Sequence, residues 1–142
     1  MIAIDTNILV HAHRADSPFH DEAIAALASL GRRRWAIPWP CLHEFLAIVT
    51  HPKIFHPPSP MTDALAAVEG WISAPGVVLL AEIEGYGQTL AEVLGRAKVV
   101  GPKVHDARVV ALCLQHAVSE LWTADRDFSR FRGLAMRNPL HS

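Results

Sequence analysis

Two aspartates of this chain stand where a parallel sheet would bring them together. Asp5 directly follows the apolar run 1–4, and Asp125 directly follows the apolar run 121–124. Short continuous apolar runs are typical of buried parallel strands. The carboxyl ends of such strands meet at one edge of a sheet, and ligands bind in the crevice outside that edge. We therefore expect both carboxylates at one ligand-binding edge.

Two further acids lie on segments with helical patterns. Within residues 41–49 the only polar residues are His43 and Glu44, so this helix should be buried, and a carboxylate there needs a hydrogen-bonding partner or a cation. Asp106 lies near the start of a helix with one apolar face, expected over 104–118. Each acid has a structural alternative, because acids in a first helical turn stabilise the helix dipole.

The four acids together suggest more than any one of them. Converging carboxylates repel one another, and a divalent cation removes that conflict. Oxygen ligands without accompanying cysteines favour Mg²⁺ or Mn²⁺ over zinc. Such ions bind phosphates and activate water, so the hypothesis is phosphodiester hydrolysis. The predicted metal ligands are Asp5, Glu44, Asp106 and Asp125.

Three polar residues beside these acids are expected to support them. Asn7 and Thr123 could hydrogen-bond the metal ligands, and Asp127 could supply a further ligand. Their structural alternatives are a cap or a strand residue, and Asp5 and Asp125 could likewise act only as helix N-caps.

Other candidates have weaker signals. Phosphate contacts could come from Arg126, Arg130 and Arg132 or from Arg32, Arg33 and Arg34, although charge runs are usually solvated. His43 and His105 flank predicted site acids, but neither is assigned as a general base. The helical face Leu65–Val68–Ile72 could form a partner surface, with core packing as the alternative.

Strands and helices alternate along the chain, which predicts an α/β fold with a mainly parallel sheet of four or five strands. A turn or N-cap at Ser17-Pro18 should start the second helix, and the proline-rich segment 51–60 should be irregular. The expected strands are 1–4, 35–38, 77–80, 121–124 and 134–137. The expected helices are 6–13, 19–30, 40–50, 61–73, 86–96 and 104–118.

Composition favours one compact domain spanning residues 1–142. Apolar residues make up 51% of the chain and charged residues 19%, which argues against disorder. No apolar run is long enough to cross a membrane, and the first residues lack the pattern of a signal peptide, so we expect a cytoplasmic protein. Cys41 and Cys113 are expected to be buried free thiols. Because the net charge is only -1, RNA binding would need local basic patches.

Four ordered segments give the chain a family resemblance. It resembles the PIN-domain ribonucleases, specifically the VapC-like toxins of bacterial toxin–antitoxin pairs. The segments are MIAIDTNILV with Asp5, WPCLHEFL with Glu44, VHDA with Asp106 and WTADRDF with Asp125. No acid of the family's set is missing, and segment 51–60 is similar to a loop of one branch of these toxins.

The resemblance implies properties that composition and spacing do not. It implies a three-layer α/β/α sandwich and an endoribonuclease that depends on Mg²⁺ or Mn²⁺. It also implies homodimerisation and a cognate VapB-like antitoxin that blocks the site. The RNA that would be cut is not specified by the sequence.

Two other classes of function compete with this hypothesis. An aspartate-nucleophile phosphatase usually has Asp-x-Asp after its first strand, whereas this chain has Asp5-Thr6-Asn7. A non-catalytic PIN or receiver-like binding module is the other alternative. A receiver usually carries an Asp after its third strand, and here Ala81-Glu82 follows 77–80.

Overall fold

The computed structural model describes residues 1–141, and its centre is a five-stranded sheet in the order β3-β2-β1-β4-β5. All four strand pairs are parallel. The expectation of a mainly parallel sheet is therefore confirmed, with five strands. The strands are β1 Ile2–Ile4, β2 Trp35–Pro38, β3 Val77–Leu80, β4 Glu120–Trp122 and β5 Ala135–Arg137.

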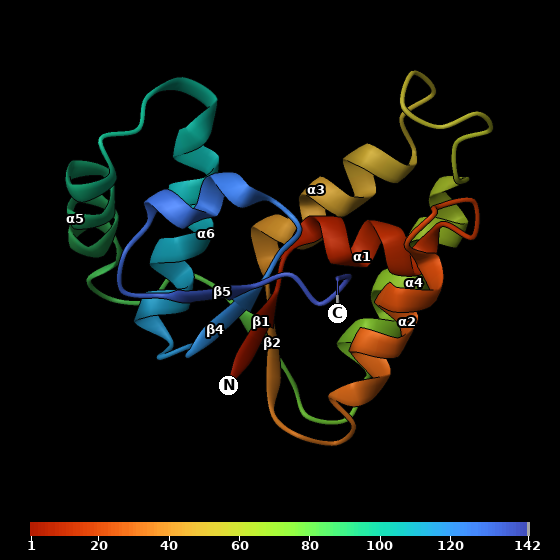
Figure 1. Ribbon diagram of the computed structural model, residues 1–142, viewed down its shortest axis with the longest axis horizontal. Helices are drawn as coiled ribbons and strands as arrows, with labels where there is room; N and C mark the ends of the chain where they lie inside the picture. The colour runs from red at the N-terminus through yellow and green to blue at the C-terminus, as the bar shows by residue number, and fades with distance from the viewer. Residues whose placement is uncertain (142) are drawn as a thin grey trace.

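Helices cover both faces of the sheet, as a three-layer sandwich requires. Figure 1 shows α5 and α6 on one side of the strands and α1, α2 and α4 on the other. Two short 3₁₀ helices, η1 Gly101–Lys103 and η2 Arg126–Arg130, precede α6 and follow β4. The α-helices are α1 Thr6–His13, α2 His20–Ser29, α3 Trp39–Val49, α4 Met61–Ile72, α5 Tyr86–Ala97 and α6 Val104–Gln115.

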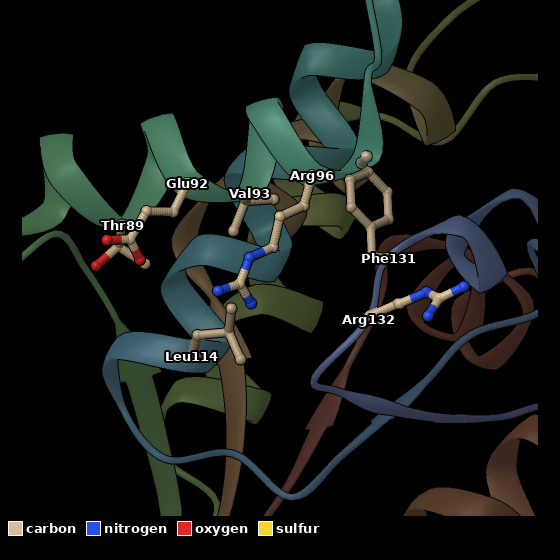
Figure 2. A pocket seen from close by; sticks show the side chains of 8 residues that line it. Thr89, Glu92, Val93, Arg96, Leu114, Phe131 and Arg132 are labelled. Atoms are coloured by element: carbon tan, nitrogen blue, oxygen red, sulfur yellow. The ribbon is translucent and has the colours of Figure 1, made fainter.

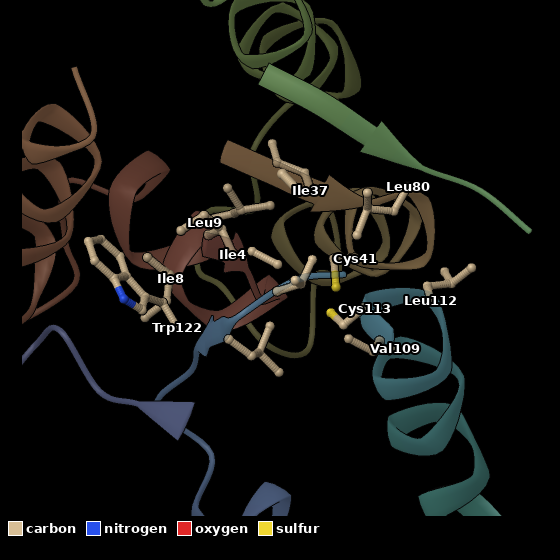
Figure 3. Close-up of a cluster of buried hydrophobic side chains, with 14 of the residues drawn as sticks. Ile4, Ile8, Leu9, Ile37, Cys41, Leu80, Val109, Leu112, Cys113 and Trp122 are labelled. Atoms are coloured by element: carbon tan, nitrogen blue, oxygen red, sulfur yellow. The ribbon is translucent and has the colours of Figure 1, made fainter. Parts of the chain in front are cut away.

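The core lies between the sheet and these helices. Ile4, Ile37 and Leu80 come from three neighbouring strands and are fully buried, as are Cys41 of α3 and Cys113 of α6 (Figure 3). Both cysteines are buried and free, as expected. The central strands are apolar on both faces because helices cover both faces. This packing fixes the ends of β1 and β4, from which the site is built.

The last helix and the fourth strand are shorter than their apolar patterns predicted. Helix α6 ends at Gln115, and Ala117 adopts a left-handed φ of 56° while the Val118 amide donates to the Cys113 carbonyl. This left-handed turn ends the helix and redirects the chain into β4. Strand β4 ends at Trp122, which pairs with Ile4, the last residue of β1. Thr123 and Ala124 therefore lie beyond the strand.

Two loop expectations had different outcomes. Ser17 is not the N-cap of α2, because that helix begins at His20 and Ser17 Oγ instead accepts from the Phe19 amide at 3.1 Å and contacts His11 Nδ1 at 2.6 Å. Segment 51–60 has no helix or strand, as its prolines predicted. Among the described residues, no helix combines the length and apolarity needed to cross a membrane.

Candidate active site

The four acids singled out from the sequence line one pocket. Its cavity volume is about 170 Å³, and Asp5, Glu44, Asp106 and Asp125 all contribute to its wall. Asp5 follows the central strand β1, and Asp125 follows the adjacent strand β4. Glu44 comes from α3, and Asp106 comes from the first turn of α6. The expected meeting of the four side chains at one end of the sheet is therefore present.

Asp5 is the most enclosed of the four, with an exposed fraction of 6%. Its Oδ1 accepts from the Thr6 amide at 2.8 Å and from Cys41 Sγ at 3.5 Å. Its Oδ2 accepts from Thr123 Oγ1 at 2.7 Å and from Asn7 Nδ2 at 3.2 Å. Burial nevertheless raises the pKa of Asp5, and the negative charge of Asp106 adds to this rise. The carboxylate is held firmly in place but is short of positive charge.

Asn7 and Thr123 join the ends of the two central strands. Asn7 Nδ2 donates to Thr123 Oγ1 at 3.2 Å, and Asn7 Oδ1 accepts from the Ala124 amide at 3.0 Å. The same Thr123 oxygen accepts from the Asp125 amide at 3.0 Å. The hydrogen bonds expected from Asn7 and Thr123 to a site acid are thus present. They fix Asp5 directly and the backbone of Asp125 through its amide.

Asp125 combines a structural role with a place in the pocket. It is the N-cap of η2, and its Oδ1 accepts from the Asp127 amide at 2.9 Å. Asp5 similarly caps α1 through the Thr6 amide. The N-cap alternative considered for both residues is therefore correct for their local structure. It does not exclude a second role, because both side chains also line the pocket.

Glu44 differs from its expected environment. Helix α3 buries Cys41, Leu42, Phe45 and Val49, but Glu44 is exposed on another face, so the expectation of a buried Glu44 was wrong. The apolar run misled because Leu46, Ala47 and Ile48 are also only partly covered or exposed. Thr6 Oγ1 donates to Glu44 Oε2 at 3.4 Å. Partial loss of water around the carboxylate, followed by the charge of Asp5, raises the pKa of Glu44.

Asp106 has a cation beside it. Lys103 Nζ lies 3.6 Å from Asp106 Oδ2 and also pairs with Asp127. Burial raises the pKa of Asp106, with the charge of Asp125 adding to the rise and Lys103 opposing it. Lys103 was not singled out from the sequence, although it stands one helical turn before Asp106. That spacing was the available signal.

The pocket suits a hard divalent cation by its donor chemistry. All four acids offer carboxylate oxygens, and the raised pKa values of three of them reflect burial together with mutual repulsion. Within residues 1–141, no three His, Cys, Asp or Glu side chains stand close enough to form a ready-made metal cluster.

Several secondary candidates lie outside this pocket. Asp127 is exposed and pairs with Lys103 instead of lining the cavity. Arg132 lines a separate hollow of about 50 Å³ between α5, α6 and Phe131, where it points away from Arg96 (Figure 2). Arg32, Arg33 and Arg34 are exposed in the turn before β2.

The two histidines that flank site acids, and the apolar face of α4, lie in different surroundings. His43 stacks on Trp39 with ring centroids 6.0 Å apart, whereas His105 lines a groove beside the acid pocket. On α4, Val68 is buried, but Leu65 is 44% exposed and Ile72 is 37% exposed. Core packing therefore explains Val68 and leaves the other two side chains on the surface.

Comparison with known proteins identifies the family. The family model described as "PIN domain" matches residues 2–134. The chain belongs to the PIN-domain family. Its PIN-domain relatives include "Ribonuclease VapC48" of Mycobacterium tuberculosis, 35% identical over 95% of this chain and 94% of the relative. "Ribonuclease VapC43" of the same species is 32% identical over 99% of this chain and 96% of the relative.

Solved structures share the PIN-domain fold at lower sequence identity. One is "Mycobacterium tuberculosis VapC20 (Rv2549c), Sarcin-Ricin loop cleaving toxin", with a TM-score of 0.70 and 19% identity over 91% of this chain and 93% of that one. Another is "VapBC2 from Rickettsia felis bound to a DNA fragment from their promoter", with a TM-score of 0.70 and 17% identity over 97% of this chain and 98% of that one. These likenesses support the three-layer fold.

Proposed function

We propose that this PIN-domain protein is an endoribonuclease that uses Mg²⁺ or Mn²⁺ and acts as the toxin of a toxin–antitoxin pair. The observation that carries the proposal is the convergence of four carboxylates on one cavity, where burial and mutual repulsion raise the pKa of three of them. The VapC ribonucleases that match nearly the whole chain support the choice of RNA as substrate.

The pocket residues have two proposed roles, which are to bind the cation and to orient the carboxylates that bind it. Asp5, fixed by four hydrogen-bond donors, would hold the cation, and Asp125 completes the wall after the adjacent strand. Glu44 and Asp106 close the pocket from two helices. When bound, Mg²⁺ or Mn²⁺ neutralises phosphate charge and lowers the pKa of water. Asn7 and Thr123 keep the Asp5 carboxylate oriented toward the pocket.

The expected partners follow from the relatives. The solved neighbours include complexes titled "VapBC2 from Rickettsia felis bound to a DNA fragment from their promoter" and "Toxin-antitoxin complex from Klebsiella pneumoniae". We infer a VapB-like antitoxin for this chain and a homodimer as its own assembly. Sedimentation of the purified protein tests the dimer, and a monomer at micromolar concentration would contradict it.

The phosphatase alternative is less well supported, because such enzymes usually have an aspartate at the position that Asn7 occupies here. Position 7 is an asparagine whose amide nitrogen donates to Asp5 and to Thr123, and whose oxygen accepts from the Ala124 amide. The side chain therefore holds the strand ends together, and its amide is too weakly acidic to protonate a leaving group. Hydrolysis of RNA in preference to small phosphate esters is the expected outcome.

The central test is Asp5→Asn in an RNA cleavage assay. Cleavage of total RNA by the wild type should require Mg²⁺ or Mn²⁺ and stop in EDTA. Asp5→Asn should lower the rate by ~1000-fold, equivalent to about 4 kcal/mol of transition-state stabilisation. Asp21→Asn, an exposed position on α2, is the matched control. Undiminished metal-dependent cleavage by Asp5→Asn would remove the proposal.

A further inference from the structure

A groove beside the acid pocket has no role in the proposal so far. It is a cavity of about 470 Å³ bounded by Pro40 at the start of α3, Lys103 of η1, and His105 and Arg108 in the first turns of α6. Glu44, Asp106 and Asp125 line both this groove and the acid pocket. The two hollows are therefore adjacent, with these three acids on their shared wall.

The groove carries positive charge next to the acids. Lys103 Nζ lies 3.6 Å from Asp106 Oδ2, and its side chain is 36% exposed. Among the salt bridges of the described residues, it is the only basic group paired with one of the four pocket acids. Arg108 contributes a second cation, with Nη2 at 3.7 Å from Glu82 Oε1 in a solvent-exposed pair. Exposed pairs of this kind are weak, so both cations can exchange partners.

A second hollow also touches Asp125 but is a poorer continuation. It has a volume of about 260 Å³ and is lined by Arg126, Arg137 and His141 among others. It shares only Asp125 with the acid pocket, whereas the Lys103 groove shares three acids. Continuity with the reacting centre therefore favours the Lys103 side.

We propose that the groove between Pro40, η1 and the start of α6 binds the RNA strand flanking the scissile phosphate, with Lys103 as its phosphate contact. This inference rests on the proposed ribonuclease activity. Four carboxylates repel a polyanion, so an RNA strand that reaches them needs a cation beside them. Lys103 is already drawn to this position by Asp106 and Asp127. A neighbouring phosphate takes over the ammonium group when RNA enters the groove.

A purely structural role for Lys103 predicts the opposite behaviour. If Lys103 only neutralises Asp106 and Asp127, its removal leaves the pocket more negative. Such a pocket takes up Mg²⁺ more tightly, and the bound cation then holds RNA at least as well as before. The sign of the change in RNA affinity therefore separates the two roles.

The test measures RNA binding in the Asp5→Asn background, so that cleavage does not interfere. A fluorescent single-stranded RNA is titrated in Mg²⁺ at several salt concentrations, and binding is followed by anisotropy. Lys103→Ala should weaken binding by about tenfold and reduce the slope of log K against log salt by about 0.7, the loss of one phosphate contact to a single strand. Lys103→Arg should retain both the RNA affinity and the salt dependence of the parent, because it keeps the positive charge.

One matched control and one competing variant complete the test. Lys53→Ala removes an exposed lysine from the 51–60 loop and is the control, and Arg126→Ala removes a cation from the competing hollow. Both should bind RNA within twofold of the parent. The inference is overturned if Lys103→Ala binds as the parent does or more tightly, or if Arg126→Ala causes the larger loss. Thermal melting of each variant confirms that it is folded.

Failure of this inference is distinguishable from failure of the proposed function. If the wild type cleaves RNA but Lys103→Ala binds RNA like its parent, only the groove assignment fails. If the wild type cleaves no RNA while Lys103 still governs RNA affinity, the groove stands as an RNA-binding surface and the ribonuclease proposal fails.

Discussion

The two halves of the acid pocket are built differently. On the strand side, Asp5 is 6% exposed and accepts from four donors, two of them the side chains of Asn7 and Thr123. On the helix side, Glu44 is exposed and accepts only a long bond from Thr6 Oγ1 at 3.4 Å. The strand side is held by several hydrogen bonds, whereas Glu44 on the helix side has one long bond. If the proposed cation binds here, Asp5 would hold it in a fixed position and Glu44 would be the less constrained ligand.

The difference between the two halves is tested most directly by replacing one acid from each half and comparing the cleavage rates. Asp5→Asn should lower cleavage by ~1000-fold, about 4 kcal/mol, and excess Mg²⁺ should not restore it because no other group occupies its fixed position. Glu44→Gln should lower cleavage only ~10-fold, and higher Mg²⁺ should restore part of the rate. Initial rates measured across a Mg²⁺ titration provide the check. Equal, unrescued losses in both variants would show that the two halves are equally rigid.

A smaller effect is expected from the groups that hold the strand side together. Asn7→Ala leaves the Ala124 amide without its partner and removes a donor from Asp5. The expected cost is ~1–3 kcal/mol in the free energy of unfolding and roughly 10–100-fold in cleavage. Urea melts and rate assays measure the two quantities.

Asn138→Ala is the matched control for this variant. Asn138 accepts from the Leu140 amide at 3.0 Å in the C-terminal segment and makes no hydrogen bond to a pocket acid. It should change cleavage by less than about twofold. If Asn7→Ala behaved like Asn138→Ala, the link between Asn7 and the orientation of Asp5 would be unsupported.

The smallest effect concerns pH and stability in EDTA. The pKa of Glu44 is raised in the folded protein, first by partial burial and then by the charge of Asp5. A carboxyl with a raised folded-state pKa favours folding below its unfolded pKa, and this contribution is lost as pH rises through the folded value. The free energy of unfolding of Glu44→Gln should therefore rise above that of the wild type as pH increases from about 4 to 7. The difference should be a few tenths of a kcal/mol, because the side chain is exposed.

Melting curves from pH 4 to pH 8 in EDTA measure this difference, and Glu22→Gln on the exposed face of α2 is the control. Saturating Mg²⁺ should reverse the order, because the wild type then gains binding energy that the variant lacks. If the wild type is more stable than Glu44→Gln at pH 7 in EDTA, the repulsion between Glu44 and Asp5 is contradicted.

The strand side and the helix side of the acid pocket also differ in how well the sequence predicts the positions of their residues. Asp5 and Asp125 could be placed because a polar residue after an apolar run marks the end of a strand, and parallel strands end together. Glu44 was assigned to the pocket correctly but to the wrong environment, since an apolar helix does not reveal which face meets solvent. Lys103 was missed because it stands at a Gly-Pro break, which hides that η1 runs directly into α6 and places Lys103 one turn before Asp106.

Strand order was the information that the sequence could not supply. The bonds from Asn7 and Thr123 exist because β1 lies beside β4, and nothing in the two short apolar runs specifies that they are neighbours. The family resemblance implied the fold, but the contacts that orient Asp5 became visible only in three dimensions.

The adjacency of β1 and β4 also has a consequence for timing during synthesis. Thr123 donates to Asp5 across 118 positions of the chain, and the Asp5 amide donates to the Trp122 carbonyl at 3.0 Å. A nascent chain that has emerged only as far as α6 lacks both bonds, although it already contains three of the four acids. The acid pocket is therefore completed only after β4 and Asp125 have been synthesised.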